Sequence, residues 1–158
     1  MAELAATPGF LSLRQEIIAL AELRRSDRVL DIGSGTGLLA LTAAPTAPTV
    51  SHVTALDVSP EMCRHLETEM ARIPLTNVNA VIGSATDLPL AAGSVDLVLS
   101  NYCFHHLNDV AFRHAAGRRE HPASVDWWQR ALEDCDFAKV AVRALAHEGG
   151  IATARRTS

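Results

Sequence analysis

The chain has 158 residues, of which 48% are hydrophobic and 20% charged, a balance typical of one globular domain spanning residues 1–158. The net charge of -4 provides no broad positive surface, so a nucleic-acid partner is not expected. No apolar run reaches the roughly 18 residues of a membrane span, and the N-terminus lacks a signal-peptide pattern, so a cytoplasmic protein is expected. Cys63, Cys103 and Cys135 lack metal-ligand spacing, and no metal site is predicted.

The first half of the chain alternates helical and strand patterns. Apolar periodicity predicts a helix over residues 9–24, and the short apolar run 28–32 predicts a buried strand. Residues 37–44 have a helical pattern that Pro45 and Pro48 are expected to end, and 52–58 is a second strand candidate. This order indicates a parallel β-α-β unit.

A third helix and two further strands are predicted next. Ser59 is a suitable N-cap and Pro60 suits the first helical position, while Pro74 is expected to end this helix. Residues 77–83 and 94–100 are strand candidates separated by a loop. The alternation predicts a parallel sheet covered on both faces.

The C-terminal third has weaker signals. A helix is expected within 106–118 and another over 124–137, followed by two strands at 138–145 and 149–156 that form a hairpin. The predicted fold class is therefore α/β: a Rossmann-like, mostly parallel sheet with helices on both faces and a C-terminal antiparallel hairpin.

The turn after the first predicted strand is rich in glycine. Gly33, Gly35 and Gly37 form G-x-G-x-G, whereas the dinucleotide fingerprint requires glycine at the position that Leu38 occupies. Asp57, at the end of the second strand, could accept hydrogen bonds from two ribose hydroxyls, although a turn or helix-capping role explains this residue alone equally well. The combination favours a nucleoside derivative as ligand and disfavours a pyrophosphate.

Three segments together carry a family resemblance. They are "VLDIGSGTG" (29–37), "ALDVSPEM" (55–62) and "GSATDLPLAAGSVDLVLSNYCFHHL" (83–107). In this order and spacing they resemble four motifs of the class I S-adenosylmethionine-dependent methyltransferases, especially the small-molecule group similar to ubiquinone and menaquinone biosynthesis methyltransferases. The resemblance covers residues 28–108 and implies S-adenosylmethionine as the cofactor.

The resemblance implies a set of cofactor-binding residues: Asp31, Gly33, Ser34, Gly35, Gly37, Asp57, Val58, Met62, Ser84, Ala85 and Asn101. Asp31 would organise the glycine turn near the methionine ammonium group. The three glycines and the serine would line the methionine and ribose portion, and Asp57 would bind the ribose hydroxyls.

The remaining implied contacts concern the adenine ring and the reacting methyl group. Val58 and Met62 would pack near adenine, and Ser84 would accept a hydrogen bond from the adenine amino group. The Ala85 amide would meet a ring nitrogen, and Asn101 would lie near the reacting methyl.

The C-terminal part departs from the family pattern. Family members continue after the fourth strand through a helix to a fifth parallel strand, and this chain contains no segment of that kind. The chain therefore resembles an internally shortened methyltransferase, with cofactor binding kept and the acceptor pocket incomplete. Residues 149–156 are expected to pair with 94–100, which gives the strand order 3-2-1-4-7-6 in the family's labels.

Two main functions compete. The motifs predict S-adenosylmethionine-dependent methyl transfer to a small-molecule acceptor; the alternative is a catalytically weak or inactive relative that only holds the cofactor. An NAD-dependent oxidoreductase is disfavoured by Leu38. No catalytic residue is assigned, because the adjacent His105 and His106 are better explained by packing and capping than by base catalysis. The sequence determines neither the acceptor nor whether the chain forms a homo-oligomer.

Overall fold

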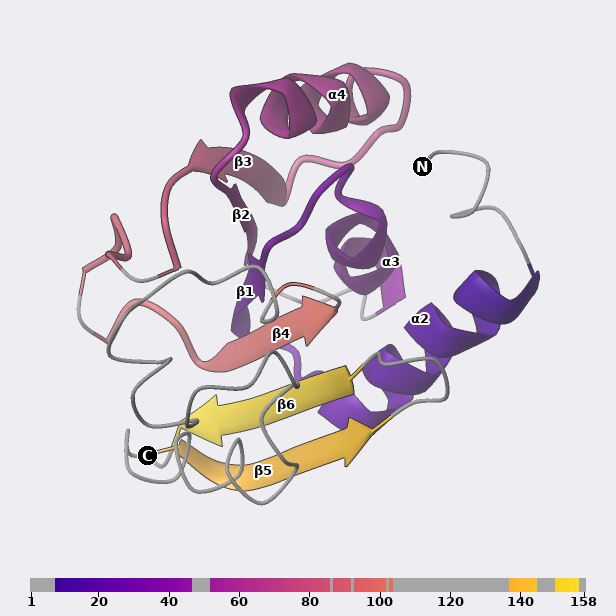
Figure 1. Ribbon diagram of the computed structural model, residues 1–158, viewed down its shortest axis with the longest axis vertical. Coiled ribbons are helices and arrows are strands. Elements are labelled where there is room, and N and C mark those ends of the chain that lie inside the picture. Colours follow the sequence, from indigo (N-terminus) through magenta and orange to yellow (C-terminus); the bar gives the residue numbers. More distant parts are fainter. Residues whose placement is uncertain are drawn as a thin grey trace, which may run out of the picture.

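The protein folds around one sheet, with strand order β3-β2-β1-β4-β6-β5 (Figure 1). The computed structural model describes residues 8–46, 52–85, 87–91, 93–101, 103, 137–144 and 150–156. The strands are β1 Arg28–Ile32, β2 His52–Asp57, β3 Val78–Ile82, β4 Leu97–Asn101, β5 Phe137–Ala144 and β6 Gly150–Arg156. Each of the six strand segments predicted from the sequence contains or closely overlaps one of these strands.

Strands β3, β2, β1 and β4 are parallel, so their carboxyl ends lie at the same edge of the sheet. The register places Ile32 beside both Leu56 and Ser100, and Asp57 beside Ile82. The Ser100 hydroxyl donates a hydrogen bond to the Ile32 carbonyl at 3.0 Å, which ties the ends of β1 and β4 together. In sheets of this kind, ligands bind outside the carboxyl ends of the strands.

The C-terminal hairpin continues the same sheet in antiparallel direction. β6 pairs with β4, with Leu99 opposite Thr153, and β5 pairs with the other side of β6. Figure 1 shows β6 between β4 and β5. This is the pairing of 149–156 with 94–100 that was expected from the sequence. Because β4 and β6 are hydrogen-bonded neighbours, no strand separates them.

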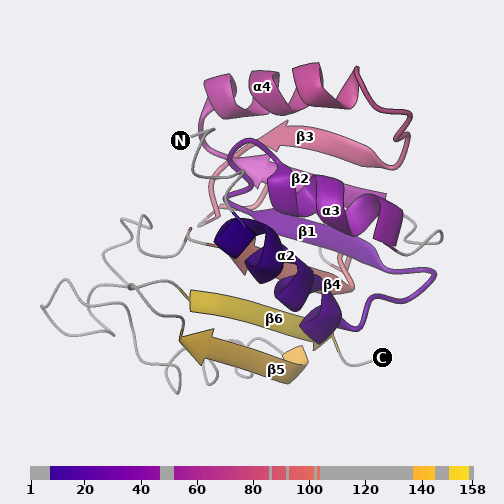
Figure 2. The same ribbon diagram turned by 90° about the vertical axis from the view of Figure 1, so that its right-hand side faces the viewer.

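The described helices cover one face of the sheet. They are α2 Pro8–Ala21, α3 Leu38–Thr46 and α4 Pro60–Met70, and Figure 2 shows α2 and α3 in front of the strands. Ile17, Ala40 and Leu66, one from each helix, are fully buried in a single core with Val29 and Val53 of the sheet.

The opposite face of the sheet has its own apolar cluster. Leu30, Ile32 and Leu56 are buried there, and Val98 and Cys103 pack against them. The alternation of Val29 and Leu30 between the two clusters shows why consecutive residues of β1 are apolar, since this strand is buried on both faces. The helices predicted within 106–118 and over 124–137 lie outside the described residues except for Phe137, which is the first residue of β5 and so does not end a helix as predicted.

The helix predicted over 9–24 is α2, and it ends earlier than expected, at Ala21. Glu22 has a φ of 46°, a left-handed conformation that cannot continue a right-handed helix. Leucine spacing beyond this residue therefore extended the prediction too far.

The other two helices differ from prediction at their C-terminal ends. α3 contains Pro45 and ends at Thr46, so Pro45 itself does not stop this helix as expected; Pro48, the other proline expected to end it, lies outside the described residues. In the last turn, proline removes one backbone hydrogen bond without breaking the turns before it. α4 begins as predicted, with the Ser59 hydroxyl accepting a hydrogen bond from the Met62 amide at 3.4 Å, but it ends at Met70, before Pro74.

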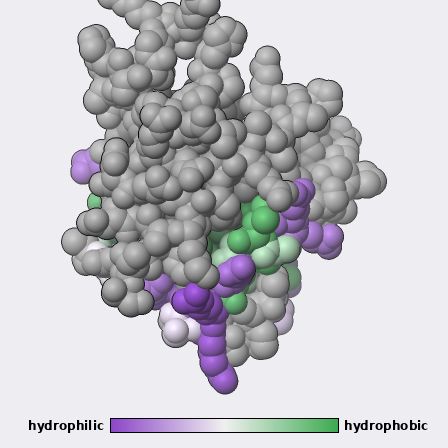
Figure 3. All heavy atoms as spheres, turned by 90° about the horizontal axis from the view of Figure 1, so that it is seen from below, coloured by the Kyte–Doolittle hydropathy of each residue, from purple (hydrophilic) through white to green (hydrophobic). Residues whose placement is uncertain are grey.

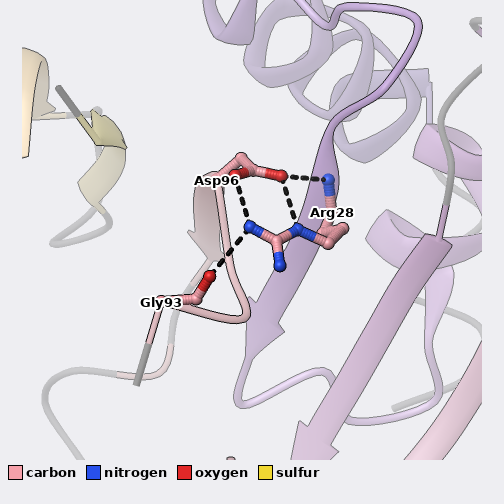
Figure 4. Close-up of polar contacts among 3 residues, drawn as sticks. All are labelled: Arg28, Gly93 and Asp96. Atoms are coloured by element: carbon pink, nitrogen blue, oxygen red, sulfur yellow. Dashed lines mark hydrogen bonds and ion pairs between the residues drawn. The ribbon is translucent and has the colours of Figure 1, made fainter. Parts of the chain in front are cut away.

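Opposite the glycine turn, a charged pair joins the starts of β1 and β4 (Figure 4). The Arg28 guanidinium donates to both Asp96 carboxylate oxygens, at 2.8 and 2.7 Å, and to the Gly93 carbonyl at 2.8 Å. Asp96 also accepts from the Arg28 backbone amide at 3.0 Å, and its own amide donates to the Arg28 carbonyl at 2.9 Å. These contacts align the two strands at the end remote from the expected ligand site.

Within the described ranges, no helix is long and apolar enough to cross a membrane. On the face seen in Figure 3, a small group of apolar side chains is bordered by hydrophilic ones.

Candidate cofactor site

The turn between β1 and α3 depends on left-handed glycines. Gly33, Gly35 and Gly37 have φ values of 66°, 53° and 77°. Residues that carry a Cβ rarely adopt such values. The amides of Gly33 and Ser34 both donate to the Leu56 carbonyl, at 2.8 and 3.0 Å, and the Gly37 amide donates to Ser34 at 2.8 Å. The turn is therefore held against the end of β2.

The three glycines are required for different reasons. A Cβ on Gly33 would lie 2.2 Å from the Cys103 sulfur, and a Cβ on Gly37 would lie 2.3 Å from Leu66 Cδ1, so both positions are closed by packing. A Cβ on Gly35 would have no atom within 4 Å. Gly35 therefore faces open space, and of the three glycines it alone is suited to direct contact with a ligand.

Asp57 connects this turn to the end of β2. Its Oδ2 accepts a hydrogen bond from the Gly35 amide at 2.8 Å, and its Oδ1 accepts from the Ser59 amide at 2.9 Å. The second contact is the turn role that was an equal alternative for this residue. Each carboxylate oxygen can accept more than one hydrogen bond, so the two contacts leave capacity for ribose hydroxyls.

Asp31 lies beneath the turn and is almost completely buried, with 1% of its surface exposed. Its Oδ2 accepts a hydrogen bond from the Ala40 amide in the first turn of α3, at 3.1 Å. Burial raises the pKa of Asp31 to about 7; the Ala40 hydrogen bond opposes this increase and the nearby Asp57 charge adds to it. The Asp31 carboxyl group therefore changes from its protonated to its charged form near neutral pH.

Two buried polar atoms at the site have no hydrogen-bond partner among the described residues. They are Ser34 Oγ, in the glycine turn, and Asn101 Oδ1, at the end of β4. A buried acceptor or hydroxyl without a partner costs about 1–3 kcal/mol. Both atoms belong to residues predicted to contact the cofactor, and a ligand with hydroxyl and ammonium groups fits this requirement.

The residues predicted to surround adenine come together at the ends of β2 and β3. Val58 directly follows Asp57 and is 74% exposed, and Met62 lies half-buried in the first turn of α4. The Gly83 amide donates to the Asp57 carbonyl at 2.9 Å, which brings Ser84 next to the end of β2. Ala85 is partly buried against the apolar cluster of the opposite face.

Cys103 is a neighbour of the site that sequence reasoning missed. Its side chain occupies the space next to Gly33. Burial raises the pKa of this thiol to about 11, with further contributions from the charges of Asp57 and Asp31, so the thiol stays protonated. Its position two residues past β4, on the motif that also contains Asn101, is the signal that could have identified it.

Among the residues that the structure describes, no group of three or more His, Cys, Asp and Glu side chains is arranged to hold a metal ion. His105 and His106 lie outside the described ranges. The structure brings together, at one edge of the sheet, all eleven residues predicted to bind the cofactor: Asp31, Gly33, Ser34, Gly35, Gly37, Asp57, Val58, Met62, Ser84, Ala85 and Asn101.

A parallel sheet whose first strand leads into a glycine turn, held by a carboxylate at the end of the second strand, defines a Rossmann-like domain for a nucleoside cofactor. A family model described as "Methyltransferase domain" matches residues 29–121, more than half of the chain. The chain therefore belongs to the methyltransferase domain family.

Individual relatives agree with this family. The chain is 36% identical over 102 residues to the probable ribosomal RNA small subunit methyltransferase A of Methanothermobacter thermautotrophicus, a match covering 63% of this chain and 34% of the relative. It is 34% identical over 94 residues to the uncharacterized methyltransferase YcgJ of Bacillus subtilis, covering 60% of this chain and 36% of the relative. The matches thus span about a third of these curated relatives.

A solved structure supports the fold over nearly the whole chain. The structure of a putative S-adenosyl-L-methionine-dependent methyltransferase from Methanococcus maripaludis is similar with a TM-score of 0.72 and 20% sequence identity. The similarity covers 99% of this chain and 90% of the other.

Proposed function

We propose that this chain transfers a methyl group from S-adenosylmethionine to a small-molecule acceptor. The observation that carries the proposal is the open space at Gly35, beside the Asp57 carboxylate that the Gly35 amide already orients. The glycine leaves room for the ligand, and the carboxylate provides acceptors for a ribose. The sheet includes strands from both halves of the sequence, which supports one domain over residues 1–158.

The proposed binding roles follow from the contacts at the site. Asp57 binds the ribose hydroxyls, and the Ser34 hydroxyl and Asn101 amide oxygen meet polar groups of the methionine portion and of the ribose, since both atoms are buried without a partner among the described residues. Asp31 stays beneath the turn and holds it through the Ala40 amide, close enough to interact with the positive charge of the cofactor.

S-adenosylmethionine supplies a methyl group that is already activated on a sulfonium. The chain then has to bind the cofactor, orient it and hold an acceptor in line with the carbon–sulfur bond. Ser34, Asp57 and Asn101 would hold the cofactor, which would supply its activated methyl group to the acceptor and keep the electron pair of the carbon–sulfur bond on sulfur. This requirement is met by positioning, without a dedicated catalytic base in the described site.

The net charge of the chain and its sequence motifs both bear on the class of acceptor. The relative from Methanothermobacter thermautotrophicus is named as a ribosomal RNA methyltransferase. The net charge of -4 gives this chain little attraction for an RNA backbone. The motif segments resemble the ubiquinone and menaquinone group, and we therefore assign a small-molecule acceptor.

A catalytically weak relative that only holds the cofactor is the second candidate. The direct pairing of β6 with β4 favours it, because the family places a fifth parallel strand at this position, on the acceptor side of the sheet. A chain without that strand can bind the cofactor and still orient the acceptor poorly. A second copy of the chain could complete the acceptor pocket, and this is the role in which we propose a homo-oligomer.

Calorimetric titration with S-adenosylhomocysteine, the product of the reaction, tests cofactor binding. We expect saturable binding by the unmodified chain and none by Gly35→Val, because a branched side chain would fill the open space and oppose a φ of 53°. Ser34→Ala, which removes one hydroxyl, should bind roughly 3–10 times more weakly than the unmodified chain.

Melting curves of both variants show whether they fold, and titration with NADH gives the comparison ligand. If the unmodified chain binds NADH but not S-adenosylhomocysteine, the proposed function is wrong. A screen of small acceptors with labelled methyl donor then separates the enzyme from the non-catalytic relative.

A further inference from the structure

Two carboxylates hold the glycine turn, and they differ in their contact with water. Asp57 is partly exposed and accepts hydrogen bonds from the Gly35 and Ser59 amides, at 2.8 and 2.9 Å. Its charge is therefore balanced before any ligand arrives. Asp31 has 1% of its surface exposed and accepts from the Ala40 amide at 3.1 Å. A cofactor on this turn therefore meets one hydrated carboxyl group and one that is cut off from solvent.

The surroundings of Asp31 offer little to balance a negative charge. The segment 33–46, which forms the glycine turn and α3, contains no charged side chain, and neither does β4. The end of β2 contributes Asp57, which has the same sign of charge, and the segment after β4 contributes the Cys103 thiol. The charged side chains of α4 are exposed or partly exposed. Arg14 of α2, the buried basic side chain of the described part, is not among the groups that shift the pKa of Asp31.

A positive ligand changes the balance at this carboxyl group. Burial and the Asp57 charge raise the pKa of Asp31 to about 7, so the group keeps its proton below neutral pH. The methionine portion of the proposed cofactor carries an ammonium group. A cation near a buried carboxyl group favours the ionised form and lowers its pKa, because the two opposite charges compensate each other where water cannot.

We propose that Asp31 releases its proton to the solvent when the cofactor binds, so that the site accepts the ammonium group together with a newly formed carboxylate. This inference rests on the proposed function, because it concerns the same cofactor. The O–H bond of the carboxyl group breaks, its electron pair stays on the oxygen, and water or buffer takes the proton. The change occurs in the binding step, before any methyl transfer.

Proton release makes cofactor binding depend on pH with a defined sign. The free protein holds one proton more than the complex, so affinity rises with pH as long as free Asp31 is still protonated. Above about pH 7 the free protein has already lost this proton, and the increase levels off. Asp31 thus has a task separate from that of Asp57: it sets the pH range in which the cofactor is held tightly.

Calorimetric titration with S-adenosylhomocysteine in buffers of different ionisation enthalpy counts the protons released. At about pH 6.5 we expect the unmodified chain to release roughly 0.8 proton per bound ligand, and its affinity to rise about tenfold from pH 6 to pH 8. Asp31→Asn cannot ionise but can still accept from the Ala40 amide, so it should release none, and its affinity should change by less than about twofold over this range.

A matched variant and a second ligand make the result specific. Asp27→Asn alters another buried carboxyl group, 4% exposed, which accepts from the Arg24 amide at 2.7 Å just before β1. This variant should release as much as the unmodified chain. 5′-Methylthioadenosine keeps the base and ribose but lacks the ammonium group, so its binding should release no proton. This comparison uses the unmodified chain and does not depend on the folding of a variant.

The possible failures are distinguishable. Binding of S-adenosylhomocysteine without proton release, equal release with 5′-methylthioadenosine, or release that persists in Asp31→Asn overturns the role of Asp31 while cofactor binding stands. If the unmodified chain does not bind S-adenosylhomocysteine at any of these pH values, the proposed function fails and this inference fails with it.

Discussion

Asp57 makes the contacts on which the proposed ribose site depends. Its two oxygens accept from the Gly35 and Ser59 amides, so the side chain is held in place before any ligand arrives. We expect Asp57→Ala to weaken S-adenosylhomocysteine binding by about 1.5–3 kcal/mol, because two ribose hydroxyls lose a charged acceptor. Calorimetry measures the affinity, and a melting curve shows whether the turn still folds. Unchanged affinity would remove Asp57 from the site.

Asp31 gives the folded protein a distinctive pH dependence. Burial raises its pKa from 3.8 to about 7, so the folded state keeps a proton that the unfolded chain releases. The contribution of Asp31 to the free energy of unfolding is therefore most favourable at or below about pH 4. It declines as the pH rises towards 7. Asn at this position cannot ionise, and its amide oxygen can still accept from the Ala40 amide.

We therefore compare the free energies of unfolding of Asp31→Asn and of the unmodified chain. The difference between them should shift in favour of the variant by roughly 2–4 kcal/mol between pH 4 and pH 8. Urea unfolding at several pH values measures this difference, and the shared titration of all other groups cancels. Parallel stability curves for the two proteins would mean that Asp31 titrates normally.

The sequence motifs supplied the candidate members of the site but not the contacts that hold each of them. The G-x-G-x-G spacing identified the turn, because three left-handed positions between a strand and a helix demand glycine. Which glycine faces open space depends on Cys103 and Leu66, which come from distant segments. Sequence spacing carries no information on such contacts, and for the same reason Cys103 was missed.

At the scale of elements, strands were predicted more accurately than helix ends. A buried parallel strand is a continuous apolar run, so Arg28–Ile32 was located from its composition alone. The end of α2 depends instead on the left-handed backbone conformation of Glu22, which leucine spacing does not encode. The apolar periodicity of a helix can therefore continue in the sequence beyond the last helical residue.

The Arg28–Asp96 contacts allow a prediction about how β1 and β4 are aligned. Asp96 accepts from the Arg28 backbone amide as well as from its guanidinium, so Asp96→Ala removes more than a surface ion pair. We expect Asp96→Ala to lower the melting temperature more than Arg28→Ala, which removes only the side-chain contacts and the Gly93 bond. Cofactor affinity should be unchanged in both variants, since the pair lies at the opposite end of the strands. A larger effect of Arg28→Ala would contradict this prediction and show that the bond to the Gly93 carbonyl contributes more than the bond from the Arg28 amide to Asp96.

For the whole molecule, the decisive feature is the position of β6 inside the sheet. It pairs with β4 on one side and β5 on the other, so both edges of its backbone are engaged. The order was predictable because no strand pattern was found between the fourth predicted strand and the hairpin, so the hairpin was expected at that edge of the sheet. The segments predicted between β4 and β5 stay predictions, because they lie outside the described ranges; their polar and broken pattern gave the sequence analysis little to rest on.

This arrangement predicts different responses to proline in the two hairpin strands. Thr153 lies opposite Leu99 of β4 and Ala141 of β5, so Thr153→Pro places a residue without an amide hydrogen in the middle of an internal strand. We expect it to destabilise the fold by about 3 kcal/mol or more. Lys139 lies in the irregular stretch of the edge strand between Ala138 and Ala141, where proline is better tolerated, so Lys139→Pro should cost far less. Urea unfolding measures both changes. Because the cofactor site is built from β1 to β4, any Lys139→Pro protein should still bind S-adenosylhomocysteine, and equal destabilisation by the two prolines would contradict an internal β6.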